Sequence, residues 1–94
     1  MKANFYVNET TGSRRLYGID LSYEIDETET ITQASATTYA KDGSSLDSSS
    51  NPQADIVSPI IYVMVTVVAT MFVEVTAETS AGQIIKRRIF IAAE

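Results

Sequence analysis

The feature that most constrains the fold is an uncharged run of eighteen residues, 56–73, in the middle of the chain. A run of this length could cross a membrane as a helix. However, most of its residues are β-branched, Pro59 lies inside it, and Asp55 and Glu74 stand at its ends, where a membrane helix usually carries Lys or Arg. Two buried strands explain the composition without these conflicts. We therefore predict a strand pair with a turn near residues 69–70, and keep the membrane helix as the alternative.

The rest of the chain also has the pattern of strands. Short runs that alternate between apolar and polar residues are separated by Gly, Ser, Asn, Asp and Pro, and no run has the 3.6-residue period of a helix. A chain of 94 residues encloses only one hydrophobic core, so residues 1–94 are predicted to form a single all-β domain. The remaining strands are expected at residues 15–22, 30–39 and 83–92, with a tight turn at 80–82 in which Gly82 takes a positive φ.

Two segments are expected to lie outside these strands. Residues 1–14 form an N-terminal arm or an edge strand. Residues 40–58 are rich in Ser, Gly and Asn and are predicted to be a long loop, in which one edge strand could lie around residues 41–46. Long irregular segments in small domains are often functional. Leu46, an apolar residue within this loop, is therefore a candidate for contact with a partner.

Composition excludes most kinds of chemistry. The chain has no His and no Cys, which removes the usual general base, the thiolate nucleophile and most transition-metal ligands. The acidic residues Asp26, Glu27 and Glu29 lack the spacing of a calcium loop and are interpreted as a solvated turn. A net charge of −5 is unfavourable for binding nucleic acid. We predict that the protein is not an enzyme, has no catalytic residue, cofactor or metal, and contacts neither nucleic acid nor a membrane.

Two further patterns, one apolar and one basic, supply candidate interface residues. In the strand at 60–69 both alternating faces are apolar, so Tyr62 and Met64 either form an exposed contact surface or are covered by the long loop. The basic run 86–88 is explained by ion pairs with acidic residues of the neighbouring strand, or alternatively by a patch for a partner. The predicted protein interface comprises Leu46, Tyr62, Met64 and Arg87.

Several short motifs together resemble a known group of proteins. They are the run Tyr-Gly-Ile-Asp-Leu-Ser at 17–22, the acidic turn that ends in Glu-Thr-Ile at 29–31, the turn Thr-Ser-Ala-Gly-Gln at 79–83, and Arg-Ile-Phe-Ile at 88–91. In this order they resemble small immunoglobulin-like virion proteins of tailed bacteriophages, of the fiber–tail adaptor type. The chain departs from that pattern at Leu21, where such proteins usually have an aromatic residue, and at 68–70, where they have a Gly-Gly turn.

The resemblance implies an immunoglobulin-like antiparallel β-sandwich of about seven short strands. It also implies a structural role in the virion, as an adaptor that joins tail or neck to fibers. The partners would be other virion proteins of the tail, neck, fiber or capsid, with this chain homo-oligomeric or repeated in the particle and made in the cytoplasm of the bacterial host. The alternatives are a capsid decoration or cement protein on the phage head, and a cellular adhesion or carbohydrate-binding module. The last would favour exposed Trp or clustered Tyr, whereas the chain has no Trp and its five Tyr are scattered in the sequence.

Overall fold

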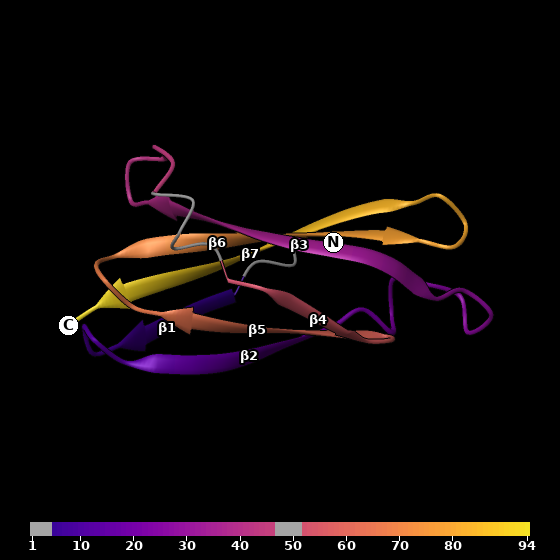
Figure 1. The fold of residues 1–94 in the computed structure, drawn as a ribbon, viewed down its shortest axis with the longest axis horizontal. Helices are drawn as coiled ribbons and strands as arrows, with labels where there is room; N and C mark the ends of the chain where they lie inside the picture. The colour runs from indigo at the N-terminus through magenta and orange to yellow at the C-terminus, as the bar shows by residue number, and fades with distance from the viewer. Residues whose placement is uncertain (1–4, 47–51) are drawn as a thin grey trace.

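The computed structural model describes residues 5–46 and 52–94, which form two sheets packed face to face (Figure 1). Within these residues there are seven strands and no helix. The strands are β1 (Phe5–Glu9), β2 (Arg14–Asp20), β3 (Ile31–Ala40), β4 (Ala54–Val57), β5 (Ile60–Thr66), β6 (Met71–Thr79) and β7 (Ile84–Ala93). The prediction of an all-β fold is confirmed.

The strand order is that of an immunoglobulin-like sandwich. One sheet has the order β1-β7-β6-β3 and the other the order β2-β5-β4, so that β2-β5-β4 and β3-β6-β7 occupy the places of the BED and CFG strands of an immunoglobulin domain. All pairs are antiparallel except β1 with β7, which is parallel. The β6–β7 turn and the β2–β3 loop lie at the right of Figure 1, here called the hairpin end. The C-terminus and the β5–β6 turn lie at the left, here called the C-terminal end.

The hydrophobic core lies between the two sheets and is built by alternation along β5, β6 and β7. Each of these strands turns every second side chain inward, which is the period of a pleated strand. Eight of the inward residues of these strands are almost completely buried: Ile61, Val63, Val65, Val73, Val75, Ala77, Ile89 and Ile91. Leu21 is also buried in this core; it stands where the phage virion proteins usually have an aromatic residue.

The uncharged run at 56–73 forms the end of β4, all of β5 and the start of β6. The predicted strand pair is therefore confirmed, and the membrane helix is wrong for this run. In the part of the chain that the structure describes, no helix is long and apolar enough to span a membrane. After β5 the chain stays buried at Val67, whose backbone exchanges hydrogen bonds of 2.8 Å with Gly12 and Ser13 in the β1–β2 turn.

The predicted 40–58 loop is only partly a loop. Its last residues form the edge strand β4, which pairs with β5. The edge strand expected around residues 41–46 is absent, because the chain there turns back on β3 and forms only an isolated bridge between Tyr39 and Ser45. Residues 47–51 of this loop and residues 1–4 of the N-terminal arm lie outside the described residues. The rest of that arm includes the edge strand β1.

The acidic loop between β2 and β3 is tied to the β6–β7 turn through Glu29. This side chain is only 8% exposed, so the interpretation of all three acids as solvated is wrong for Glu29. Its carboxylate accepts hydrogen bonds from the Thr79 hydroxyl and from the Gln83 side-chain amide, the latter at 2.9 and 3.0 Å. The hydrogen bond from Thr79 is the main reason why the pKa of Glu29 lies below its ordinary value of 4.5.

We predict that this carboxylate makes stability depend on pH. Because the pKa of Glu29 is lowered on folding, its contribution is complete above the ordinary value of 4.5 and is lost as the pH falls through the lower, folded value. Glu29→Gln is expected to lower the free energy of unfolding at neutral pH, with a difference from wild type that narrows in acid. Urea denaturation at a series of pH values measures this.

Asp42→Asn is the matched control. The pKa of Asp42 is also lowered, mainly by the hydrogen bond from the Ser44 hydroxyl, but this bond lies in an exposed turn. We expect a much smaller loss of stability from Asp42→Asn than from Glu29→Gln. Equal losses, or a Glu29→Gln difference that does not change with pH, would contradict the role given to Glu29.

Candidate functional site

The outer face of the β2-β5-β4 sheet carries an apolar strip made of Leu16, Tyr62 and Met64, here called the β5 strip. Leu16 lies directly across from Met64 in the β2–β5 pair, and Tyr62 lies across from Gly18. Leu16 is 58% exposed and Met64 is 41% exposed. The described residues therefore leave the strip open to solvent, which is unusual for neighbouring large apolar side chains and is typical of contact surfaces.

Tyr62 is held in place by its small neighbour. A Cβ atom at Gly18 would come within 2.9 Å of Cε1 of the Tyr62 ring, so the ring lies directly over Gly18. This contact half-buries Tyr62 and fixes its orientation on the strip. A tyrosine that is already ordered loses little conformational entropy when a partner covers it. The strip is therefore a preformed surface on a rigid strand pair.

The four residues predicted to form an interface do not come together. Tyr62 and Met64 share the β5 strip, whereas Leu46 is half-buried, packs against the core and donates a backbone hydrogen bond of 3.2 Å to Thr38 of β3. Arg87 lies on the inward side of β7 in the other sheet. The structure thus gives one surface with two of the predicted residues, and places the other two in separate surroundings.

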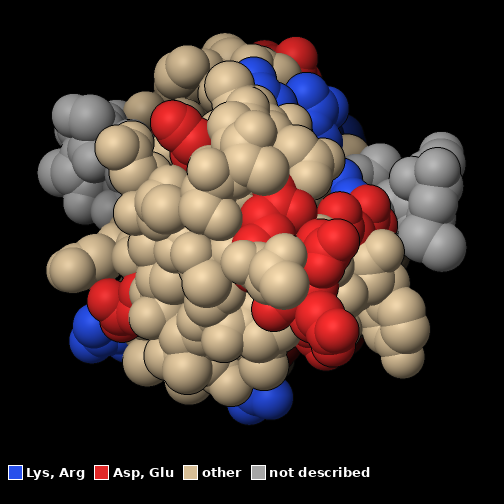
Figure 2. All heavy atoms as spheres, turned by 90° about the vertical axis from the view of Figure 1, so that its right-hand side faces the viewer, with Lys and Arg blue, Asp and Glu red and all other residues tan. Residues whose placement is uncertain are grey.

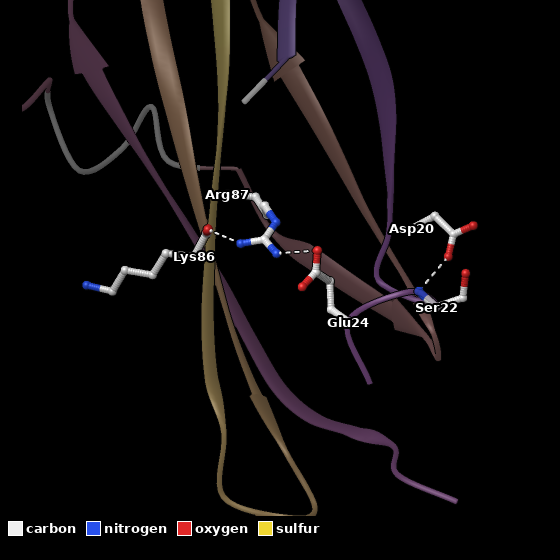
Figure 3. A network of polar contacts seen from close by, with 5 residues as sticks. All are labelled: Asp20, Ser22, Glu24, Lys86 and Arg87. Atoms are coloured by element: carbon white, nitrogen blue, oxygen red, sulfur yellow. Dashed lines mark hydrogen bonds and ion pairs between the residues drawn. The ribbon is translucent and has the colours of Figure 1, made fainter. Parts of the chain in front are cut away.

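Arg87 is already engaged within the chain. Its guanidinium contacts the carboxylate of Glu24 at 2.8 Å and donates to the Lys86 carbonyl oxygen at 2.8 Å (Figure 3). Asp20 accepts a hydrogen bond from the Ser22 backbone at 2.9 Å and shapes the start of the loop that carries Glu24. The arginine therefore links strand β7 to the β2–β3 loop.

The expected pairing of the basic run with β6 is confirmed only in part. Arg88 lies across from Glu74 and forms an ion pair with it at 3.1 Å. Arg87 instead lies across from Val75, and its side chain points to the opposite face. Sequence reasoning missed the Glu24 partner, because that residue lies in a loop whose position depends on how the sheets pack.

A row of four aromatic side chains crosses the outer face of the β1-β7-β6-β3 sheet, with one ring on each strand. Tyr6, Phe90, Phe72 and Tyr39 occupy paired positions along this row. The ring centroids are 5.1 Å apart for Tyr6 and Phe90, 5.3 Å for Phe90 and Phe72, and 4.9 Å for Phe72 and Tyr39. Sequence reasoning missed the row, because its members are scattered along the chain and meet only in the folded register.

The spacing of the row shows how the rings are arranged. It is close to the distance between strands, about 4.8 Å. The two outer pairs, Tyr6 with Phe90 and Tyr39 with Phe72, are stacked, whereas the central pair, Phe72 with Phe90, is tilted by 39°. The guanidinium of Arg88 lies 5.0 Å from the centroid of Phe72 and adds a cation–π contact. Each ring thus packs against at least one neighbouring ring of the row. Its clearly open member is Tyr6 on the edge strand, which is 72% exposed.

A cavity of about 390 Å³ lies beside this row at the C-terminal end of the sheet and is here called the Lys41 cavity. Its lining is mainly apolar and aromatic. The lining residues are Tyr6, Val7, Asn8, Lys41, Thr70, Met71, Phe72, Phe90, Ile91 and Ala92. Lys41 is the one charged residue among them. Among the described residues, Lys41 takes part in none of the ion pairs.

Tyr17 of β2 forms a polar contact with Glu9, the last residue of β1. Its hydroxyl donates to Glu9 at 3.0 Å, and Arg15 contacts the same carboxylate at 3.4 Å. Burial, with the hydrogen bond and the negative charge of Glu9, raises the pKa of Tyr17 to about 12. A phenol with this pKa is protonated at neutral pH and does not act as a base or nucleophile there. The contact joins β1 to β2.

No model of a protein family matches the chain, and no curated protein matches it. The resemblance to phage virion proteins therefore depends on the short motifs at 17–22, 29–31, 79–83 and 88–91. Within residues 5–46 and 52–94, no group of three or more acidic side chains is placed to hold a metal ion.

We predict that Gly18→Ala will displace the Tyr62 ring and lower the free energy of unfolding by about 1 kcal/mol, a typical cost of overpacking. Gly18 does not need a positive φ, so the alanine backbone itself is not strained. In a Tyr62→Ala background the same change is expected to be neutral or stabilising, because the steric conflict is gone and alanine restricts the unfolded chain. Urea denaturation of the wild type, the two single variants and the double variant gives the coupling free energy between Gly18 and Tyr62. If the effects of the two single changes simply add in the double variant, the proposed contact is contradicted.

We predict that substitutions in the aromatic row cost more stability at its centre than at its edge. Phe72 is buried between two rings, so Phe72→Ala is expected to cost about 3 kcal/mol. Tyr6→Ala removes an exposed ring that stacks on one side only, and is expected to cost less than about 1 kcal/mol. Chemical denaturation measures both values. Similar costs for the two changes would show that the row is not packed as described.

Proposed function

We propose that this chain is a structural protein of a tailed-bacteriophage particle, an adaptor that joins tail or neck to fibers through protein–protein contacts. The observation that carries the proposal is the β5 strip, in which Leu16, Tyr62 and Met64 present adjacent apolar side chains on a rigid sheet. Such a surface gains free energy when a partner removes it from water, with Tyr62 as an aromatic anchor. The motif resemblance supports the phage setting.

The proposed function is non-catalytic. Recognition would use shape and apolar area, because the chain has no His or Cys. In a small domain the core leaves little surplus stability, so contacts with neighbours in a particle would add to it. This favours a protein that works as part of an assembly.

Two other functions use the same fold. A decoration protein on the phage head could dock through the same strip. The position of the chain within the particle, in the head or in the tail, distinguishes this function from that of an adaptor. A carbohydrate-binding module needs open aromatic faces on which a sugar ring can stack. The aromatic row has Tyr6 and Tyr39 at its opposite ends and leaves one clearly open ring, that of Tyr6, because Phe72 and Phe90 between them pack against their neighbours. This arrangement favours the adaptor function over sugar binding.

We predict that Tyr62→Asp or Met64→Asp leaves a folded protein but abolishes its incorporation into particles. A carboxylate on the β5 strip would be buried without a partner in the bound state, which typically costs several kcal/mol. Particles made from a genome that carries each change are purified, and the chain is quantified in their tails and heads. Circular dichroism and thermal denaturation confirm the fold.

Ser35→Asp is the matched control, because it adds the same charge at an exposed position of the other sheet. We expect it to be incorporated like the wild type. Normal incorporation of both strip variants would disprove the proposed role of the strip. Recovery of the chain in the head fraction alone would favour the decoration protein.

A further inference from the structure

We infer that copies of this chain associate head to tail, with Tyr23 of one copy inserted into the Lys41 cavity of the next. This inference goes beyond the proposed function and does not depend on it, because both partners are the same chain. It uses two features at opposite ends of the molecule that neither the core nor the β5 strip explains. One is an exposed tyrosine in an acidic loop, and the other is an apolar cavity with a lysine.

Tyr23 projects from the hairpin end of the molecule. It is 95% exposed, although tyrosine is usually at least partly covered. The surrounding segment, residues 20–29, contains five acids and no Lys or Arg. Figure 2, which faces this end, shows acidic side chains gathered together. Glu24 is paired with Arg87 and Glu29 is buried. The negative charge around Tyr23 therefore comes from Asp20, Asp26 and Glu27, which take part in none of the ion pairs among the described residues.

The loop that carries Tyr23 is fixed at several points. The backbone N–H groups of Glu24 and Ile25 donate to the Leu21 carbonyl oxygen at 2.9 and 3.2 Å, and Leu21 itself is buried. The next residue, Glu24, is held by Arg87 at 2.8 Å. A side chain on such a loop needs little further ordering to bind, so more of its contact energy is available for association.

The Lys41 cavity has the properties that a tyrosine in an acidic loop requires. Its volume, about 390 Å³, lies at the lower end of the range of typical ligand pockets and is sufficient for one aromatic ring. Phe72 and Phe90 supply apolar walls, and Tyr6 supplies an open ring face for stacking. Lys41 at the wall gives a positive charge opposite the acids that flank Tyr23.

Charge selects this arrangement over symmetrical ones. The chain has a net charge of −5, so two copies repel each other unless opposite charges face one another. A two-fold contact between cavities would bring two Lys41 side chains together, and a two-fold contact between Tyr23 loops would bring two acidic segments together. Tyr23 in the Lys41 cavity is the combination that pairs opposite signs.

The positions of the two features determine what such a contact builds. Tyr23 lies in the β2–β3 loop at the hairpin end, whereas Lys41, Thr70 and Ala92 lie at the C-terminal end. The molecule is 41 Å long and about half as wide. A contact between opposite ends of an elongated molecule is heterologous, so it repeats into a ring or an open row of copies.

Sedimentation velocity over a range of protein concentrations tests the inference. The wild type is expected to form species larger than a dimer as concentration rises, and added salt is expected to weaken them. Tyr23→Ala is expected to weaken association roughly tenfold or more, as for loss of an aromatic anchor, whereas Tyr23→Phe keeps the ring and retains association. Ala92→Glu, an exposed change that places a carboxylate in the cavity, is expected to have the same effect as Tyr23→Ala. Lys41→Glu is the second cavity variant in case Ala92→Glu does not fold.

Mixing the two defective variants is the decisive step. Tyr23→Ala retains a working cavity and Ala92→Glu retains a working Tyr23, so together they are expected to form a dimer and nothing larger. A monomeric wild type, a Tyr23→Ala variant that associates normally, or a mixture that gives no dimer would each overturn the inference. Met64→Asp is expected to self-associate like wild type, so failure of this contact and failure of the β5 strip are observed separately.

Discussion

The structure depends on the inward row of β5 packing against the inward rows of β6 and β7. Ile61, Val63 and Val65 are almost wholly buried there, and burying side chains of this size contributes about 1.5–3 kcal/mol each. The strand period of two then turns Tyr62 and Met64 to the outside. The same alternation that makes the core thus also creates the β5 strip, so no change of register could remove the strip without exposing the core.

Polar contacts close the sandwich where apolar packing ends. At the hairpin end, Glu29 holds the β2–β3 loop against Thr79 and Gln83, and the Arg87–Glu24 ion pair holds the same loop from the side of β7. A buried or half-buried charge is costly without partners, and here each charge has at least one. These contacts give a long surface loop a defined shape, which a loop of polar residues would not acquire from hydrophobic burial.

Local alternation in the sequence was sufficient to predict the class of fold, the strands β2, β3, β5, β6 and β7, and the turn at Gly82. What it could not predict depends on pairing between distant segments. The edge strand β4 has only four residues and lies in a polar segment, so its own composition gives little signal. The partner of Arg87 could not be predicted, because Glu24 lies in a loop and not on the neighbouring strand β6. The aromatic row requires the parallel register of β1 on β7, which connects Tyr6 to Phe90 across almost the whole chain.

For the candidate site, the sequence showed that Tyr62 and Met64 share a face but could not show whether that face is covered. Exposure of Leu16 beside Met64 decides this for the described residues, and Leu16 comes from a strand more than forty residues away. The β5 strip lies on the flat face of one sheet, while Tyr23 and the Lys41 cavity lie at the two ends of the molecule. A component that is repeated in a particle and also binds a different protein needs surfaces that can be occupied at the same time. The separation of these surfaces meets that geometric requirement, since a contact at either end leaves the strip on the face open.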